Sequence, residues 1–186
     1  MSMLVMLSGG ADSATLLWQF KNLPGLLAVC FMYGQKHKKE VESARWLAIK
    51  CGIDLHVVDV GGIKEFLRPN EHNVFPSRNL VFLSMATTIA VSRGLLSVGF
   101  AATKDDFDTF PDCRRVFVDA ARKAMELASS RPINLIAPYL ELTRKQVVEI
   151  GREIDVPYDK TWSCYRGGEW PCGLCNPCVS RKECGI

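Results

Sequence analysis

A short segment of serine, glycine and aspartate near the N-terminus carries the clearest chemical signal in this chain. The segment Ser8–Ser13 has the sequence SGGADS and lies between an apolar run, Met3–Leu7, and a helical pattern over Asp12–Phe20. Glycines let the backbone turn tightly and present N–H groups, and a helix N-terminus adds unpaired donors with a dipole that favours anions. Because Ser8 and Ser13 add hydroxyl groups, the segment predicts a phosphate or pyrophosphate site.

The pattern differs from the two commonest phosphate loops. No lysine follows the glycines, so GxxxxGK[ST] is absent, and GxGxxG is absent as well. SGGADS resembles the SGGxDS pyrophosphate loop of the ATP pyrophosphatases, in which ATP is cut between its α- and β-phosphates and an acyl or amide oxygen becomes adenylated. The alternative is a Gly-Gly turn followed by ordinary helix N-cap residues.

Cysteines form a second group of chemically competent residues. Five of the eight crowd the last 23 residues, and in a reducing compartment such crowding indicates metal binding rather than disulfides. Four of them, spaced x7, x2 and x2, can close a tetrahedral Zn²⁺ site with no open position, so the predicted zinc is structural. Its ligands would be Cys164, Cys172, Cys175 and Cys178. An iron–sulfur cluster also uses four cysteines and is the alternative, and Cys184 is expected to be a bystander.

Length and composition limit the class of protein. A chain of 186 residues with 48% hydrophobic and 23% charged residues predicts one globular domain with a small appendage. The net charge of +3 is weakly basic, which suits small anions, and direct binding of nucleic acid is not expected. No apolar stretch approaches the ~20 residues of a spanning helix, and the N-terminus has no signal-peptide pattern, so we expect no membrane contact and a cytoplasmic location.

Strand and helix patterns alternate along the chain. Buried strands are predicted at Met3–Leu7, Leu26–Tyr33, Leu55–Val60, Leu96–Ala101 and Ile133–Ala137. Helices are predicted at Asp12–Phe20, Lys36–Lys50, Arg78–Arg93, Phe110–Leu127 and Thr143–Ile154, the last with Thr143 as N-cap. Repeated βα units predict an α/β fold with a Rossmann-like, doubly wound, mainly parallel five-stranded sheet and helices on both faces. Ser8–Ser13 then falls at the carboxyl edge of the sheet, where ligands bind.

Further motifs, taken in order, resemble those of the 7-cyano-7-deazaguanine synthase (QueC) family. Tyr33-Gly34-Gln35 with His37 resembles a YGQ-x-H segment, and PSRNLVFL, which contains Arg78 and Asn79, resembles a PGRN-x-x-F-L helix start. Asp106-Phe107 followed by FPDCR resembles DF-x-x-YPDCR, and TWSCYRGGEWPCGLCNPC resembles the family's zinc-binding tail. The ordered set spans essentially the whole chain. It implies a Rossmann-like ATP pyrophosphatase domain over residues 1–160 and a zinc-binding tail with four cysteine ligands over 161–186.

The resemblance implies an ATP-dependent ligase of queuosine and 7-deazaguanine biosynthesis. Such an enzyme adenylates 7-carboxy-7-deazaguanine, lets ammonia form the amide, and adenylates the amide so that the nitrile, 7-cyano-7-deazaguanine (preQ0), forms by elimination. Mg²⁺ with ATP and structural Zn²⁺ are the implied cofactors, and a homodimer is the implied assembly. The implied catalytic residues are Asp12, Ser13 and Arg114, of which Asp12 would orient Mg²⁺ or a phosphate-bound water, or only cap its helix.

The implied binding residues form two sets. ATP would contact Leu7, Ser8, Gly9, Gly10, Ala11, Asp12, Ser13, Tyr33, Gln35, Arg78, Asn79 and Lys104. The acid would contact Asp106, Phe107, Asp112 and Arg114. The two carboxylates suit the N1–H and 2-amino donors of a guanine-like ring, and Arg114 suits the substrate carboxylate or the α-phosphate. Helix starts, caps and solvated faces are the plain alternatives for these positions.

Three features depart from the family's pattern. The stretch Gly61–Pro76 is short where the family carries a longer insertion, Ala101 stands near a common glycine, and the chain ends eight residues after Cys178. The short stretch would form a smaller lid over the site, which would admit water and favour release of the 7-amido product. A short C-terminal tail would weaken the contact between the subunits of a homodimer. The remaining alternatives are a tRNA thiolase, which the weak basic charge disfavours, and a nucleotide-binding subunit without turnover.

Overall fold

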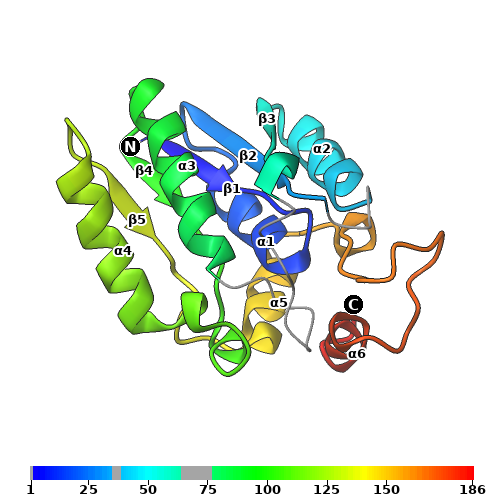
Figure 1. Cartoon of the computed structure of the whole chain (residues 1–186). Helices are drawn as coiled ribbons and strands as arrows, with labels where there is room; N and C mark the ends of the chain where they lie inside the picture. Colours follow the sequence, from blue (N-terminus) through cyan, green and yellow to red (C-terminus); the bar gives the residue numbers. More distant parts are fainter. Residues whose placement is uncertain (1, 35–38, 64–76) are drawn as a thin grey trace.

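A single parallel sheet forms the centre of the molecule in the computed structural model, which describes residues 2–34, 39–63 and 77–186. The strand order is β3-β2-β1-β4-β5, and every neighbouring pair is parallel. The strands are β1 (Met3–Met6), β2 (Leu26–Met32), β3 (Leu55–Asp59), β4 (Ser97–Gly99) and β5 (Asn134–Ile136). Because helices cover both faces, the central strand is apolar throughout and Met3, Leu4 and Val5 are fully buried (Figure 1).

Helices form a layer on each face of this sheet. One core cluster joins the sheet to α1 (Ala11–Phe20), α2 (Lys39–Cys51) and α5 (Arg144–Glu153). The other joins it to α3 (Arg78–Ser92) and α4 (Arg115–Ala128), which lie side by side in Figure 1. The predicted doubly wound α/β fold is therefore confirmed. The strand order places β1 between the two halves of the sheet, which is the point where such folds bind ligands.

One predicted helix is wrong in its extent. The continuous helix expected over Phe110–Leu127 is two pieces, a 3₁₀ turn at Pro111–Cys113 and then α4. Arg114 between them has extended backbone angles, φ −68° and ψ 151°. The Asp112 side chain accepts a hydrogen bond from the backbone N–H of Asn79, which ties the turn to the start of α3. The sequence pattern carries no sign of this long-range contact.

Thr143 caps α5 as the sequence predicts. Its hydroxyl accepts from the Gln146 N–H, and the Gln146 side chain accepts from the Thr143 N–H at 2.9 Å, which completes a capping box. The start of α5 is therefore fixed by local hydrogen bonds, and the first helical residue, Arg144, has a defined position.

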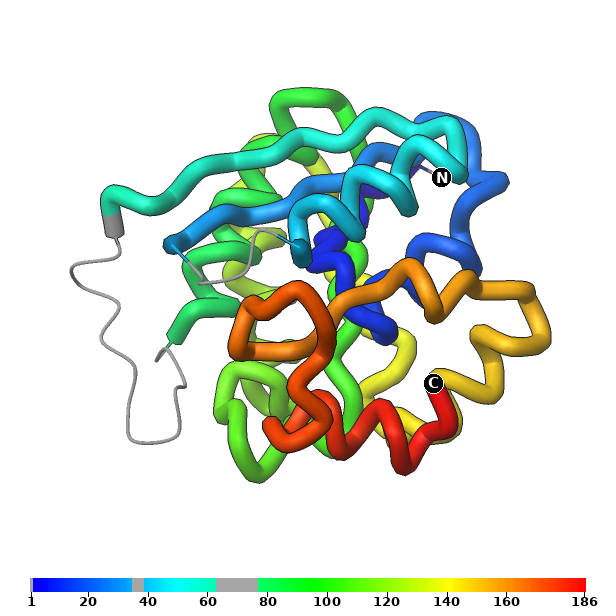
Figure 2. Tube along the Cα trace, turned by 90° about the vertical axis from the view of Figure 1, so that its right-hand side faces the viewer, coloured from blue at the N-terminus to red at the C-terminus, as the bar shows by residue number. Residues whose placement is uncertain are grey.

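The cysteine-rich tail folds back onto the domain and contains a helix, α6 (Asn176–Glu183), that the sequence analysis did not predict. The Arg152 guanidinium of α5 donates to the carbonyls of Cys184 and Gly185, at 2.8 and 3.0 Å. Arg181 of α6 donates to the Thr161 hydroxyl and the Tyr158 carbonyl. Figure 2 shows the tail, orange to red, returning beside the gold segment of α5. The C-terminal end of the tail is thus held to α5 and to the segment at which the tail begins.

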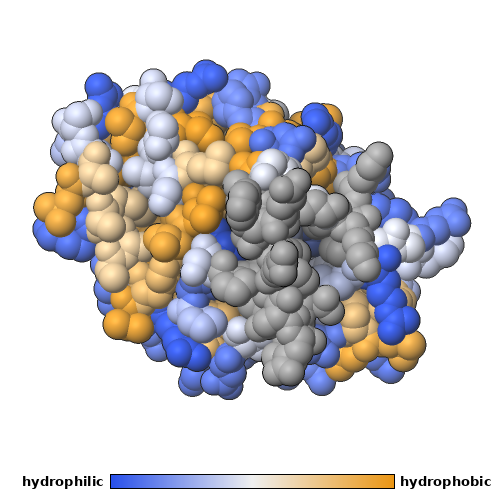
Figure 3. All heavy atoms as spheres, in the orientation of Figure 1, coloured by the Kyte–Doolittle hydropathy of each residue, from blue (hydrophilic) through white to orange (hydrophobic). Residues whose placement is uncertain are grey.

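The outer surface of α3 is poor in charge, whereas α4 carries five charged residues beside its exposed apolar side chains, namely Arg115, Asp119, Arg122, Lys123 and Glu126. No charged residue occurs between Asn79 and Ser92, and α4 exposes Val116 and Leu127 at 75% and 74% of their surfaces. Figure 3 shows apolar residues gathered over these helices. None of the helices in the described part of the chain is both long enough and apolar enough to cross a membrane.

Candidate functional site

A cavity of about 840 Å³ opens at the carboxyl edge of the sheet, beside the point where the strand order reverses. Seven stretches of chain surround it: the Ser8–Ser13 segment, the end of β2, the starts of α2, α3 and α5, the loop that follows β4, and the tail. Its polar and charged lining residues include Ser8, Asp12, Ser13, Tyr33, Glu40, Arg78, Asn79, Asp105, Asp106, Asp108, Arg144, Ser163, Tyr165, Ser180 and Arg181.

The Ser8–Ser13 segment has the backbone geometry that an anion-binding loop requires. Gly9 has φ +87°, a conformation that favours glycine, and Gly10 in extended geometry precedes the first turn of α1. The Ser8 and Ser13 hydroxyls lie 3.0 Å apart, and the Ser13 hydroxyl also donates to the Gly10 carbonyl. The free N–H groups at the start of α1 therefore open into the cavity together with two hydroxyl groups.

An arginine joins two carboxylates in the same cavity. Arg144 Nε donates to Asp12 Oδ2 at 3.0 Å, and Arg144 Nη2 donates to Asp106 Oδ1 at 2.7 Å. The three side chains are only 16–23% exposed. Burial raises the pKa of Asp12 to about 6, against the opposing attraction of Arg144. At neutral pH Asp12 is therefore an ionised carboxylate held in a place that penalises its charge.

Asp12 also has an oxygen available for a cation. Its second oxygen, Oδ1, is buried and has no hydrogen-bond partner among the described residues. A buried ionised oxygen without a donor costs free energy, so it points to a ligand that supplies positive charge. Carboxylate oxygens are what Mg²⁺ prefers, and the residues present therefore fit a magnesium ion bound with a nucleotide phosphate.

Aromatic and charged side chains form the wall at the end of β2. Arg78 Nη1 donates to the Tyr33 hydroxyl at 2.9 Å, and the guanidinium lies 5.3 Å from the centroid of the Tyr33 ring. Phe82 stacks on Phe31, with centroids 4.6 Å apart, and also contacts Tyr33. Burial raises the pKa of Glu40 to about 7, which Arg78 opposes. This wall offers flat apolar surface beside hydrogen-bonding groups, as a purine ring requires.

The structure separates the residues predicted for the acid. Asp106 lines the cavity, whereas Phe107, Asp112 and Arg114 do not. Arg114 Nε donates to the Phe107 carbonyl at 2.7 Å, and Asp112 caps α3. Asp112 therefore supports the start of α3, and contact of either side chain with the acid stays a prediction.

Most of the residues predicted for ATP lie together. Leu7, Ser8, Gly10, Ala11, Asp12, Ser13, Tyr33, Arg78 and Asn79 all line the cavity. Gly9 and Lys104 do not line it, and Gly9 lies against α2. Gln35 and most of the Gly61–Pro76 stretch lie outside the described residues.

Comparison with known proteins decides the family. A sequence profile described as "Queuosine biosynthesis protein QueC" matches residues 2–71 and 68–185. The chain belongs to the QueC family. A protein of Caldicellulosiruptor saccharolyticus named 7-cyano-7-deazaguanine synthase is 36% identical over 203 aligned positions, which cover 98% of this chain and 90% of that protein. One of the same name from Archaeoglobus fulgidus is also 36% identical and covers 98% of this chain and 85% of its own length.

A solved structure supports the fold of this QueC-family chain. The NMN synthetase from Francisella tularensis aligns with 100% of the chain and 72% of its own length, with a TM-score of 0.63 and 18% identity. At this identity the likeness shows a shared fold and nothing of the substrate.

The tail of this QueC-family chain holds a site suited to a metal ion. The Sγ atoms of Cys164, Cys172, Cys175 and Cys178 lie within 4.8 Å of one another, and those of Cys172 and Cys178 are 3.9 Å apart. Four thiolates at about 2.3 Å from one tetrahedral ion would be about 3.8 Å apart, so the spacing fits. Backbone N–H groups of Leu174 and Cys175 lower the pKa of Cys172 to about 6, which favours the thiolate that binds metal. Cys184 lies outside this group, as expected.

Several cavity residues of this QueC-family chain were missed by the sequence analysis. Arg144, Glu40, Trp162, Ser180 and Arg181 all line the cavity and come from α5, α2 and the tail. Trp162 lies beside the pyrophosphate loop because its N–H donates to the Gly9 carbonyl at 2.9 Å. Arg144 follows a predicted N-cap, but nothing in its own neighbourhood indicates that it faces Asp12, 132 residues away.

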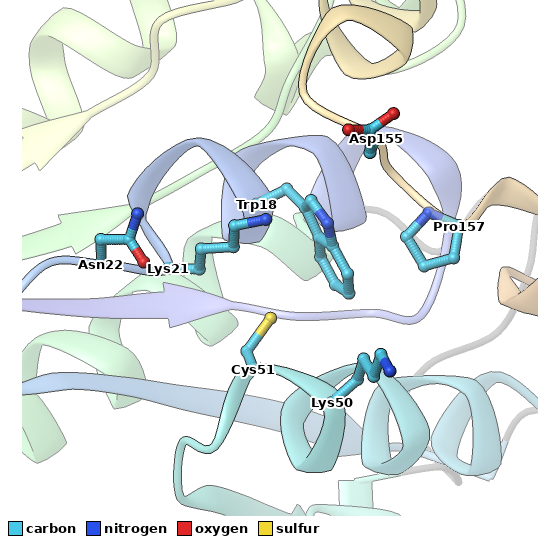
Figure 4. A pocket seen from close by; sticks show the side chains of 7 residues that line it. All are labelled: Trp18, Lys21, Asn22, Lys50, Cys51, Asp155 and Pro157. Atoms are coloured by element: carbon cyan, nitrogen blue, oxygen red, sulfur yellow. The ribbon is translucent and has the colours of Figure 1, made fainter.

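A second, smaller hollow of about 440 Å³ lies far from this chemistry. It is formed where α1, α2 and α5 end, which is the amino edge of the sheet, and Figure 4 shows Trp18, Lys21, Cys51 and Pro157 around it. Lys21 already covers the Trp18 ring, with Nζ 5.4 Å from the centroid. We assign function to the larger cavity, where the anion loop and the buried charges meet.

Proposed function

We propose that this chain is an ATP-dependent ligase that converts 7-carboxy-7-deazaguanine and ammonia to 7-cyano-7-deazaguanine. The observation that carries the proposal is the QueC-family match along nearly the whole chain, with relatives named 7-cyano-7-deazaguanine synthase. A pyrophosphate-type loop that opens into a large cavity supports ATP as the co-substrate.

The reaction needs two activations. A carboxylate oxygen of the acid attacks the α-phosphorus of ATP, and pyrophosphate leaves. Ammonia then attacks the acyl carbon, a proton is lost from nitrogen, and AMP departs with the former carboxylate oxygen to leave the amide. The amide oxygen attacks a second ATP in the same way. Loss of AMP and of the remaining N–H protons then gives the nitrile.

The loop residues hold the departing pyrophosphate in this scheme. Ser8, Ser13 and the N–H groups of α1 donate to its oxygens, and the helix dipole adds positive potential where charge develops. Asp12 Oδ1 would hold the Mg²⁺ that enters with ATP, and this ion neutralises charge on the phosphates. Tyr33, Arg78 and Asn79 are placed to contact the nucleoside part.

Recognition of the base is assigned to the loop that follows β4. Asp106 lines the cavity beside Asp105 and Asp108, and carboxylates suit the paired donors on the edge of a guanine-like ring. Asp112 and Arg114 form hydrogen bonds to Asn79 and Phe107, and their contacts with the acid stay a prediction, which is tested below for Asp112. Ala101 also lines the cavity and would narrow the approach of the ring.

We also propose that the metal is zinc. A cube of four irons and four sulfides would need its cysteine sulfurs much farther apart than the 4.8 Å found here, whereas one tetrahedral ion fits. With all four positions taken by protein ligands, the ion would be structural. Reduced thiolates and the use of ATP both favour the cytoplasm as the location.

A homodimer is proposed from the resemblance, without a direct role for nucleic acid. The charge-poor surface of α3, which exposes Leu80, supports it, since interface cores are depleted of charged residues. Light scattering of the purified protein measures its mass and tests this part of the proposal.

A product assay by mass spectrometry tests the function. Purified protein is incubated with 7-carboxy-7-deazaguanine, ammonium, Mg²⁺ and ATP. The nitrile with two AMP per product is the expected result. Accumulation of the amide with one AMP would show that the chain stops after the first activation. No consumption of acid or ATP would contradict the proposal and would favour a nucleotide-binding subunit.

A further inference from the structure

Arg144 is hydrogen-bonded to three segments that line the cavity. Besides Asp12 and Asp106, its Nη1 donates to the Ser180 hydroxyl of α6 at 3.0 Å. Its backbone N–H donates to Asp105 Oδ2 at 2.8 Å. The capping box of Thr143 fixes the residue at the start of α5. One side chain therefore joins the anion loop, the loop after β4 and the metal-binding tail.

The two carboxylates that Arg144 holds belong to different halves of the proposed reaction. Asp12 lies in the first turn of α1, where pyrophosphate is expected. Asp106 ends the 3₁₀ turn after β4, and its Oδ2 accepts from the Thr103 N–H and hydroxyl, both at 3.0 Å. They flank the strands β1 and β4, between which the strand order reverses. The shared guanidinium is thus a direct bridge between the ATP side and the acid side.

Stability alone does not account for this arrangement. Buried ion pairs are often no more stabilising than apolar side chains of the same volume, because both charges lose their hydration. Here Asp12 additionally keeps Oδ1 buried without a partner among the described residues. The cluster lies on the wall of the cavity and not in either apolar core. A costly polar cluster at this place indicates that it serves the reaction.

We propose that Arg144 is a positioning residue for adenylation, which holds the ATP-binding loop and the acid-binding loop at a fixed separation through Asp12 and Asp106. The proposal rests on the proposed function. Transfer to the α-phosphorus needs the attacking oxygen in line and in contact, and an error of about 1 Å can cost about 10²-fold in rate. A planar guanidinium can bond two carboxylates at once in a set geometry, whereas an ammonium is a point charge that cannot reproduce it.

The test is Arg144→Lys, which keeps the charge and loses the planar bridge. We expect acid-dependent release of pyrophosphate at saturating ATP and acid to fall about 10²-fold, while the Kd of Mg-ATP changes less than about threefold. Arg144→Gln, which also loses the charge, should weaken binding of Mg-ATP as well. Arg115→Lys is the matched control, because Arg115 pairs with Glu141 at 2.6 Å on the exposed surface and should behave as the wild type.

Two further measurements separate positioning from a structural role. Thermal unfolding of Arg144→Lys should stay close to that of the wild type, since its charge is retained. Asp106→Asn is then combined with Arg144→Lys and turnover is measured at saturating ATP and acid, so that weaker binding of the acid through Asp106 does not count. The double variant should lose no more turnover than Arg144→Lys alone, because both changes break one bridge. Wild-type rates in Arg144→Lys, or additive losses in the double variant, would overturn the proposal. A wild-type protein that does not use this acid would instead contradict the proposed function.

Discussion

Gly9 lies directly against the backbone of Glu40. A Cβ atom built on Gly9 would stand 2.2 Å from the Glu40 carbonyl oxygen and 3.0 Å from the Ser43 side chain, so only glycine allows the loop to meet α2 this closely. The contact ties the anion loop to the helix that carries Glu40, whose side chain lies at the aromatic wall of the cavity. The anion loop and α2, which form two walls of the site, can therefore pack together because residue 9 has no side chain.

Replacing Gly9 with alanine should damage both folding and ATP binding. Its φ of +87° is unfavourable for alanine, and the added methyl group collides with α2. We expect a loss of at least about 2 kcal/mol in the free energy of unfolding, which exceeds the roughly 1–2 kcal/mol of the backbone conformation alone. Gly52→Ala is the matched control, since Gly52 has φ +66° with nothing within 4 Å of a built Cβ. Equal losses in the two variants, measured by urea unfolding, would refute the collision.

Asp12→Asn should stabilise the ligand-free protein while it abolishes turnover. The folded-state pKa of Asp12 is about 6, above its ordinary value of 3.8, because burial penalises the charge. The folded protein therefore binds this proton more tightly than the unfolded chain, and stability falls as pH rises between these two values. At pH 8, we expect the free energy of unfolding of the variant to exceed that of the wild type by about 2 kcal/mol. At pH 5 this difference should be smaller by about 1 kcal/mol. Both are measured by unfolding without Mg²⁺ or ATP. Lower stability of the variant at pH 8 would contradict the assigned environment.

Asp112→Ala tests whether this carboxylate caps a helix or contacts the acid. Asp112 Oδ2 accepts from the Asn79 N–H at 2.8 Å, so its removal leaves the start of α3 without this acceptor. We expect a loss of about 1 kcal/mol in the free energy of unfolding, as for other cap deletions. Asp112→Asn keeps an acceptor and should recover part of it. The KM for the acid should change less than twofold in both variants, and a large rise in this KM would restore the role in binding.

Cys175→Ser should lower metal content and stability together. The four sulfurs of the tail suit one ion, and loss of a thiolate weakens the site that holds the start of α6. We expect bound zinc, measured by elemental analysis, to fall from about one per chain to near zero, with a lower unfolding temperature. Cys51→Ser is the control, because Cys51 lies outside the cluster. A metal-free variant of normal stability would show that the ion is not structural.

The sequence by itself determined the fold, the anion loop and the group of four cysteines. Apolar strands alternate with amphipathic helices, and this periodicity leaves few topologies other than a parallel sheet covered on both faces. The anion loop and the four cysteines are also local patterns, in which residues close in sequence must be close in space. Even Thr143 could be identified as an N-cap, because its partner is only three residues away.

The tertiary structure decided which charged residues share the cavity. Arg144 reaches Asp12 across 132 positions, and no periodicity records such a contact. Asp112 and Arg114 also form hydrogen bonds to Asn79 and Phe107, which the sequence pattern does not record. Spacing reports the order of residues along the chain, whereas a charged side chain takes the partners that packing brings within about 3 Å of it. The identity of the site could be predicted from its motifs, and its electrostatic organisation required the folded chain.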